Sequence, residues 1–253
     1  MKPQNETQQR LKSLYEDFKA KAAMPEDLAK RLSPPLLLNV PPKWAEASKK
    51  VLVIGQETLG WDFRQGDYYP WPYPALSNFN DFLLSDHAVE ALIEGYTHFE
   101  FALHQPGNYN SPFWRAYREI RSSIGEEADG ADTAVLWTNL FRMSLDHGSV
   151  VENGSPEDIQ SINNITRDLL QAEIAILAPT AVIFFTGPNY NQHLYARFPG
   201  CVLREFNSHD PEKTGALQHP ALPAVAYRTY HPGYLSRGHW HIVEELTSAL
   251  AVH

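Results

Sequence analysis

Short runs of apolar residues alternate along the chain with stretches of helical spacing. Four apolar, β-rich runs end in polar or glycine-containing sequence, and they cover Val51 to Gly55, Ala134 to Thr138, Ala181 to Thr186 and Ala224 to Thr229. Runs of this kind are typical of strands buried on both faces. Helical patterns occur at about 112–123, 156–177 and 239–250. The alternation predicts an α/β fold of three layers, in which helices cover both faces of a central four-stranded parallel sheet.

Two further segments flank this alternation. Residues 7–32 carry apolar side chains at helical spacing until Pro34-Pro35 ends the pattern, which predicts an N-terminal helical cap over about residues 1–45. An insertion at about 61–110 is rich in proline, tyrosine and asparagine and suits the wall or lid of a site. Because no shift in composition divides the chain, we expect one domain over residues 1–253.

Composition excludes several classes of protein. The single cysteine, Cys201, rules out a disulfide framework and a cysteine-rich metal site, and no apolar run approaches the length of a membrane span. We therefore expect a cytoplasmic monomer that needs no membrane. The net charge of -9 argues against extensive contact with DNA phosphates. The stretch from Arg228 to His241 nevertheless holds two arginines, three histidines and no acid, so a local basic face is possible.

Polar residues directly follow the apolar runs. In an open parallel sheet, ligands bind beyond the carboxyl ends of the strands, so these residues are the first functional candidates. They are Gly55-Gln56-Glu57-Thr58, Asn139-Leu140-Phe141-Arg142, Gly187-Pro188-Asn189 and Tyr230-His231-Pro232. We expect the four strand ends to converge on one crevice.

Several segments resemble, in order along the chain, motifs of the uracil-DNA glycosylase superfamily. Residues 231–237, His-Pro-Gly-Tyr-Leu-Ser-Arg, resemble the classical His-Pro-Ser-Pro-Leu-Ser and the mismatch-specific Asn-Pro-Ser-Gly-Leu-Ser-Arg. Gly55-Gln56-Glu57 is similar to the classical Gly-Gln-Asp. Residues 106–114, Pro-Gly-Asn-Tyr-Asn-Ser-Pro-Phe-Trp, resemble the mismatch branch's Pro-Gly-Pro-Gly-Asn-His-Phe-Trp, and Thr138-Asn139-Leu140 matches that branch's Thr-Asn-Met. The resemblance implies a DNA glycosylase that uses neither a metal nor a cofactor.

The resemblance also implies roles for individual residues. His231 would donate a hydrogen bond to the departing base, and Glu57 would stabilise the sugar cation and position water. Asn139 would pair with uracil N3–H and O4, a donor and acceptor pattern that cytosine reverses. The remaining residues would contact the base or the DNA: Gln56, Leu59 and Trp61 the base, Leu235 the duplex as an apolar wedge, and Ser111, Ser236 and Arg237 the phosphates.

Departures from the motifs and simpler readings leave alternatives open. Glu57 is one methylene longer than the aspartate of the motif, and Thr58-Leu59 replaces its proline and tyrosine, so the exclusion of thymine is undecided. Taken singly, Asn139 could be a turn residue and Leu235 a core residue, and Phe113 and Trp114 are more typical of packing. The main alternative is a non-catalytic binder of a nucleobase, nucleotide or nucleic acid on the same fold.

Other enzyme classes have weaker support. A metal hydrolase could use His231, His239 and His241, but no His-Glu-x-x-His motif accompanies them. The glycine pattern of nicotinamide-binding folds and the Gly-x-Ser-x-Gly of serine hydrolases are both missing from the sequence.

Overall fold

The central sheet of the protein has six strands. In the computed structural model, which describes residues 6–58, 73–98, 110–130 and 132–252, their spatial order is β2-β1-β3-β6-β5-β4. The strands are β1 (Val51–Glu57), β2 (Val135–Phe141), β3 (Ala181–Phe184), β4 (Val202–Glu205), β5 (Gly215–Gln218) and β6 (Val225–Arg228). Strands β2, β1, β3 and β6 run parallel, and each of them falls on one of the predicted apolar runs. The α/β class is therefore confirmed.

The predicted extent of the sheet was wrong. Strands β5 and β4 continue it as an antiparallel hairpin beside β6, so the sheet is mixed rather than purely parallel. Three of the four residues of β4 are exposed, and none is buried, so this edge strand has no apolar run that would reveal it. Edge strands need no second buried face, because one side of them meets solvent.

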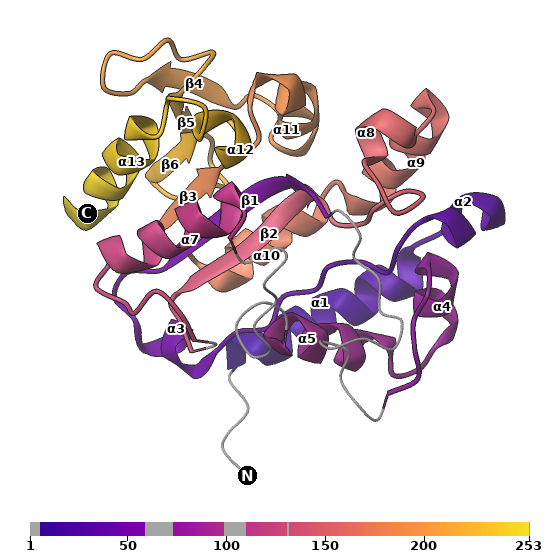
Figure 1. Ribbon diagram of the computed structural model, residues 1–253. Helices are drawn as coiled ribbons and strands as arrows, with labels where there is room; N and C mark the ends of the chain where they lie inside the picture. The colour runs from indigo at the N-terminus through magenta and orange to yellow at the C-terminus, as the bar shows by residue number, and fades with distance from the viewer. Residues whose placement is uncertain (1–5, 59–72, 99–109, 131, 253) are drawn as a thin grey trace.

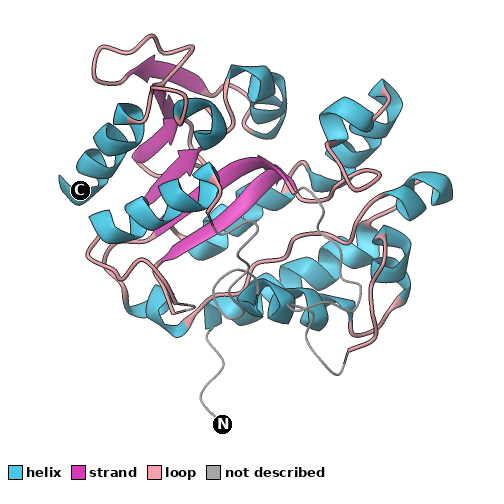
Figure 2. Cartoon of the chain, viewed as in Figure 1, coloured by secondary structure: helices cyan, strands magenta, loops and turns pink. Residues whose placement is uncertain are grey.

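Helices lie on both faces of the sheet (Figure 2). Before β2 they are α1 (Glu6–Lys21), α2 (Glu26–Arg31), α3 (Pro42–Glu46), α4 (Phe79–Leu84), α5 (Ala88–His98) and α7 (Pro112–Ser123). After β2 they are α8 (Val150–Asn153), α9 (Pro156–Thr166), α10 (Leu169–Leu177), the 3-10 turn η1 (Pro188–Tyr190), α11 (Asn191–Arg197), α12 (Pro232–Leu235) and α13 (His241–Val252). Figure 1 shows α7 close to α12 and α13, and these three helices pack together. Among the described helices, none combines the length and apolar character needed to cross a membrane.

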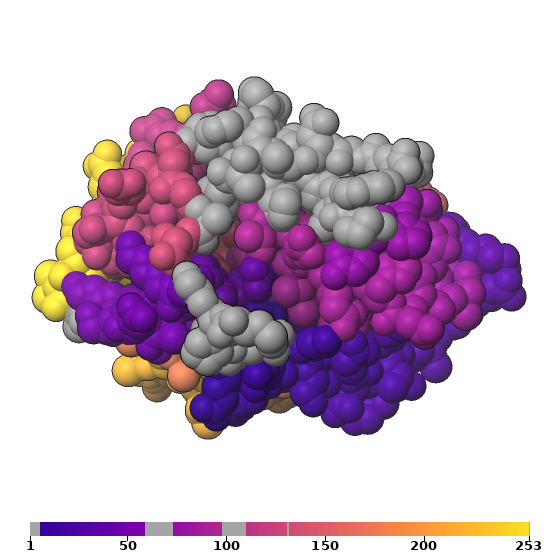
Figure 3. Space-filling view, turned by 90° about the horizontal axis from the view of Figure 1, so that it is seen from below, coloured from indigo at the N-terminus to yellow at the C-terminus, as the bar shows by residue number. Residues whose placement is uncertain are grey.

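The N-terminal helices are fastened to the body of the protein by a buried polar network. The Tyr15 hydroxyl of α1 donates to Glu173 of α10 over 2.8 Å, and it accepts the Leu38 N–H over 3.0 Å. Glu173 also pairs with Arg142, which directly follows β2. Figure 3 shows α1 in indigo lying against the violet and magenta residues of α4 and α5 on the same face. The predicted helical cap is thus part of the main core.

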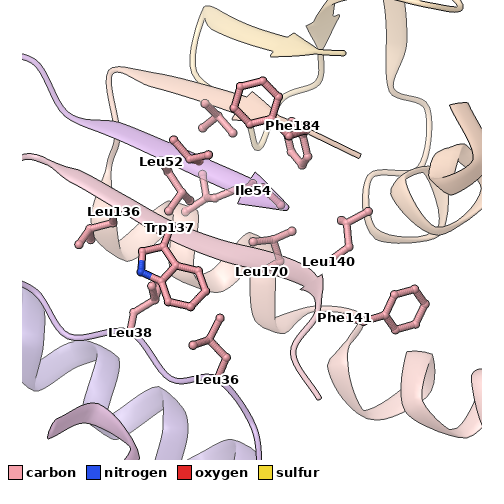
Figure 4. Packing of buried hydrophobic residues seen from close by; sticks show 14 of the residues in the cluster. Leu36, Leu38, Leu52, Ile54, Leu136, Trp137, Leu140, Phe141, Leu170 and Phe184 are labelled. Atoms are coloured by element: carbon pink, nitrogen blue, oxygen red, sulfur yellow. The ribbon is translucent and has the colours of Figure 1, made fainter. Parts of the chain in front are cut away.

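The hydrophobic core surrounds the parallel strands. Leu52 and Ile54 of β1 are fully buried, as is Phe184 of β3. Figure 4 shows them with the side chains of β2, where Trp137 faces the segment that carries Leu36 and Leu38. In the sheet, β2 lies on one side of β1, whereas β3 and then β6 lie on the other side of β1. The order of the strands therefore reverses between β1 and β3, and this is where α/β folds bind ligands.

Candidate active site

Backbone and side-chain hydrogen bonds join the strand ends at this reversal point. The Gln56 side chain donates from Nε2 to the carbonyl oxygen of Thr186 over 2.7 Å, which links the end of β1 to the end of β3. The Gly187 N–H donates to the Thr229 carbonyl oxygen over 2.9 Å, which links β3 to β6. Gly187 has φ of 69°, a left-handed conformation that glycine adopts without strain. The predicted convergence of these strand ends is present.

Asn139 lies directly against a glycine of the neighbouring strand. Gly55 and Asn139 are in register across β1 and β2, and Asn139 is 6% exposed. A Cβ atom on residue 55 would lie 2.2 Å from the Asn139 Oδ1 atom and 3.2 Å from a ring carbon of Phe113. Both distances are below ordinary van der Waals contact, so a glycine at position 55 leaves the room that the amide occupies.

Thr58 fixes the orientation of the Asn139 amide. The Asn139 Nδ2 atom donates to the Thr58 hydroxyl over 3.0 Å, and that hydroxyl donates to the Phe141 carbonyl oxygen over 3.1 Å. Among the described residues, none donates a hydrogen bond to the Asn139 Oδ1 atom. With respect to the described residues, the amide therefore retains an acceptor and one further N–H donor. Thr58 differs from the residue in the glycosylase motif that this segment resembles. Here its hydroxyl orients the Asn139 amide.

His231 is held as a neutral hydrogen-bond donor. Its Nδ1 atom accepts the Gly233 N–H over 3.1 Å and so caps α12. Nδ1 cannot accept this bond while it carries a proton, so the neutral ring has its proton on Nε2. Burial lowers the pKa of His231 and favours this neutral form. Phe113 stacks on the imidazole, with ring centroids 6.1 Å apart and an interplanar angle of 14°.

These contacts define one half of the site, which we call the amide–imidazole group. It consists of Gly55, Thr58, Phe113, Asn139 and His231. Phe113 touches both the amide side and the imidazole side, although the sequence indicated only packing for it. The Ser111-Pro112 start of α7, where Ser111 is the N-cap, places Phe113 in the first turn facing the strand ends.

Glu57 belongs to a different set of contacts, which we call the carboxylate group. The Glu57 Oε1 atom accepts the Val151 N–H from the first turn of α8 over 3.0 Å. The side chains of Ser149 and Tyr190 also lie near this carboxylate and act to lower its pKa. Burial raises the pKa of Glu57, and the hydrogen bonds oppose that rise only in part. In the part of the chain that the structure describes, no hydrogen bond joins Glu57 to Asn139 or His231.

The predicted wedge does not project from the surface. Leu235 is 0% exposed and packs in the hydrophobic core, because the single turn of α12 directs it inward, so this structure does not present it to a duplex as the sequence led us to expect. The adjacent Tyr234 is 44% exposed.

The residues predicted to hold phosphates have different surroundings. Ser236 and Arg237 are exposed, and the Ser236 hydroxyl donates to the Gly233 carbonyl oxygen. Ser111 is half-buried, and its hydroxyl accepts the Trp114 N–H as the N-cap of α7.

Two predicted base contacts lie outside the described residues, namely Leu59 and Trp61. Within the described ranges, no group of three or more histidine, cysteine, aspartate or glutamate side chains is arranged to hold a metal ion.

No family model and no curated protein matches the sequence.

Proposed function

We propose that the protein is a DNA glycosylase that hydrolyses the N-glycosidic bond of uracil or a related damaged base, on a fold like that of the uracil-DNA glycosylases. The observation that carries the proposal is the amide–imidazole group. An amide of fixed orientation and a neutral imidazole donor both lie at the strand ends. Phe113 stacks on the imidazole and lies beside Gly55, the glycine that faces the amide. This combination suits a flat base with alternating donors and acceptors on its edge.

The chemistry assigned to the site follows from its charges. In the reaction, water adds to C1′ of the sugar as the bond to the base breaks, and the base departs as an anion with the bonding electrons. The proton that the water loses finally neutralises this anion. The His231 Nε2–H would donate to the oxygen on which negative charge develops. The Asn139 Oδ1 atom would accept the N3–H of the base, and the second Nδ2 hydrogen would bind its O4. The Glu57 carboxylate would stabilise the positive charge on the sugar and orient the water.

The Phe113 ring gives the flipped base an apolar boundary. It is half-buried, so part of its surface remains accessible at the strand ends. Contact with an aromatic ring offsets part of the free energy of unstacking a base, which is a few kcal/mol. Phe113 therefore serves as an aromatic contact for the base in this proposal, in addition to Trp61, which lies outside the described residues.

A second function, binding of a base without cleavage, is favoured by one observation. The carboxylate group and the amide–imidazole group share no hydrogen bond among the described residues, and Glu57 is already hydrogen bonded to α8. A crevice of this kind could recognise a base while the carboxylate serves only to anchor α8.

One experiment separates the two functions. The protein is incubated with oligonucleotides that carry uracil in a single strand or in U·A and U·G pairs, with a T·G duplex for comparison, and abasic sites are then cleaved with alkali. A glycosylase gives strand breaks at uracil, and Asn139→Ala abolishes them. The matched control is Asn164→Ala, at an exposed asparagine of α9. Binding of the uracil strand without breaks, at stoichiometric protein, would establish the binding function and refute the catalytic one.

A further inference from the structure

A ladder of stacked rings leads from the strand ends to the surface. Tyr230 and Tyr234 stack with centroids 4.3 Å apart and an interplanar angle of 25°. Tyr234 and His239 stack with centroids 5.3 Å apart and an angle of only 3°. Tyr230 directly precedes His231 and lies against Gly187, at the strand ends, whereas His239 is exposed. We call these three residues, Tyr230, Tyr234 and His239, the ring ladder.

The ladder is held rigidly although it lies at the surface. Tyr234 is covered by a ring on each side, yet 44% of it remains exposed at its edge. The backbone around it is also constrained: the Arg237 N–H donates to the Tyr234 carbonyl oxygen, and the His239 N–H donates to that of Leu235. A preorganised aromatic surface binds a further ring at low cost in side-chain entropy.

The charge around the ladder is positive, in contrast to the net charge of -9 for the whole chain. Residues 228–241 contain no acid, and the exposed Arg237 lies in the turn between Tyr234 and His239. Two acids of the packed helices are already engaged, whereas Glu244 in the first turn of α13 is exposed. Glu119 of α7 binds Arg115 and the Trp240 indole, and Glu245 of α13 binds His209.

Rings beside a free cation fit a nucleic-acid strand whose bases are unpaired. The faces of paired bases are covered by their neighbours, whereas an unpaired base can stack on a protein ring whatever its identity. Binding of duplex DNA depends on many phosphate contacts, which an acidic protein disfavours. An exposed stack with one arginine therefore suits a single strand better than a duplex.

We propose that the ring ladder and Arg237 form a binding surface for single-stranded nucleic acid outside the crevice. A base adds to the outer face of His239 as the next ring of the stack, and Arg237 binds the adjoining phosphate. Tyr234 is a positioning residue, because it holds His239 parallel to the incoming base. Binding at this surface is independent of cleavage in the crevice.

The test uses a fluorescein-labelled single strand of roughly 12 nucleotides that contains no uracil, together with its RNA counterpart and its duplex. Fluorescence anisotropy should show saturable binding of at least one single strand, with the duplex bound more weakly. His239→Ala and Tyr234→Ala should each weaken binding about tenfold, the loss expected for one stacked base. Tyr234→Phe, which keeps the ring, should bind like the wild type. Arg237→Ala should weaken binding and flatten its dependence on salt.

A matched control and the cleavage assay make the outcome decisive. Tyr195→Ala removes another tyrosine at a helix surface, which is 36% exposed on α11, and should leave binding unchanged. An equal loss in Tyr195→Ala, or a duplex bound as tightly as its single strands, would overturn the proposed surface. Loss of uracil excision in an Asn139 variant that retains ladder-dependent binding would leave this inference intact. Excision by a protein that binds no uracil-free strand would refute this inference alone.

Discussion

The amide–imidazole group and the carboxylate group occupy the same edge of the sheet but are built on opposite electrostatic principles. In the first, Asn139 and His231 are neutral: the Asn139 Nδ2 atom donates to Thr58, and the His231 Nδ1 atom accepts from Gly233. Among the described residues, none is hydrogen bonded to the Asn139 Oδ1 atom or to the His231 Nε2 atom. In the second, Glu57 is a carboxylate whose burial raises its pKa, and its hydrogen bonds are made to the protein itself. Under the proposed function, the amide–imidazole group would recognise the base, which requires neutral groups of fixed orientation. The carboxylate group would act in catalysis, which requires a charge to be kept away from water.

Replacement of the charge is expected to have the largest effect. Glu57→Gln keeps an oxygen for the Val151 N–H but cannot stabilise a sugar cation, so turnover should fall by about 10²- to 10⁴-fold. The raised pKa means that the ionised side chain disfavours the folded state once pH exceeds the pKa of an unfolded glutamate. The melting temperature of the variant at pH 7.5 should therefore equal or exceed that of the wild type.

Two measurements would check this prediction. Alkali cleavage reports turnover, and a thermal melt followed by circular dichroism reports stability. Glu152→Gln is the matched control, because Glu152 is an exposed acid of the same α8 turn, and it should leave the plateau turnover above the acid limb unchanged. If Glu57→Gln retains wild-type turnover, the carboxylate group is only an anchor for α8, and the site reduces to its recognition half.

Loss of the imidazole donor should have the next largest effect. His231→Ala removes one hydrogen bond to the developing anion and should lower turnover by about 10²- to 10³-fold. Because burial lowers the pKa of His231, the active neutral form is present at neutral pH and is lost only as pH falls through that lowered pKa. The wild-type rate should accordingly show no decline between about pH 7 and 9, where neutral histidine persists. His219→Ala serves as the control, and a decline above pH 7 would contradict a neutral donor.

A smaller change in the amide–imidazole group tests whether its geometry matters as much as its chemistry. Gly55→Ala places a methyl group 2.2 Å from the Asn139 Oδ1 atom, so the amide must turn away. A displacement of about 1 Å in such a site lowers the rate about 10²-fold. Selectivity between uracil and cytosine should fall as well, and competition with cytosine-containing strands measures it. Gly125→Ala controls for the added methyl group in open space, although its φ of 82° will lower stability somewhat.

Much of the parallel core could be predicted from the sequence, because its elements are locally encoded. The helix at 112–123 begins with Ser111 and Pro112, an N-cap followed by a proline in the first turn, and its predicted bounds agree with α7. The four buried strands have apolar runs that only a covered sheet explains. Strands β4 and β5 could not be predicted in the same way, since their stability comes from pairing beside β6 rather than from their own composition.

The candidate site was only partly predictable, for a different reason. The sequence placed Gln56, Asn139 and His231 at the strand ends, where the structure has them. It could not show that Thr58 would orient Asn139 or that Tyr190 would face Glu57, because these contacts join residues far apart in the chain. Leu235 and Tyr234 are neighbours, and only the direction of one helical turn decides which is buried.

The last prediction concerns the least obvious member of the carboxylate group. The hydroxyl of Tyr190 acts to lower the pKa of the Glu57 carboxyl, against the larger effect of burial. Tyr190→Phe removes that hydroxyl and keeps the ring that lies edge-on to Phe141, so the fold should be unchanged. The pKa of Glu57 should then rise further, and the acid limb of the rate profile should move to higher pH while the plateau rate stays nearly constant. A purely structural tyrosine would leave the position of that limb unchanged. Because Glu152 also raises the pKa of Glu57, Glu152→Gln should move the same limb to lower pH, so opposite shifts in the two variants would identify Glu57 as the titrating group.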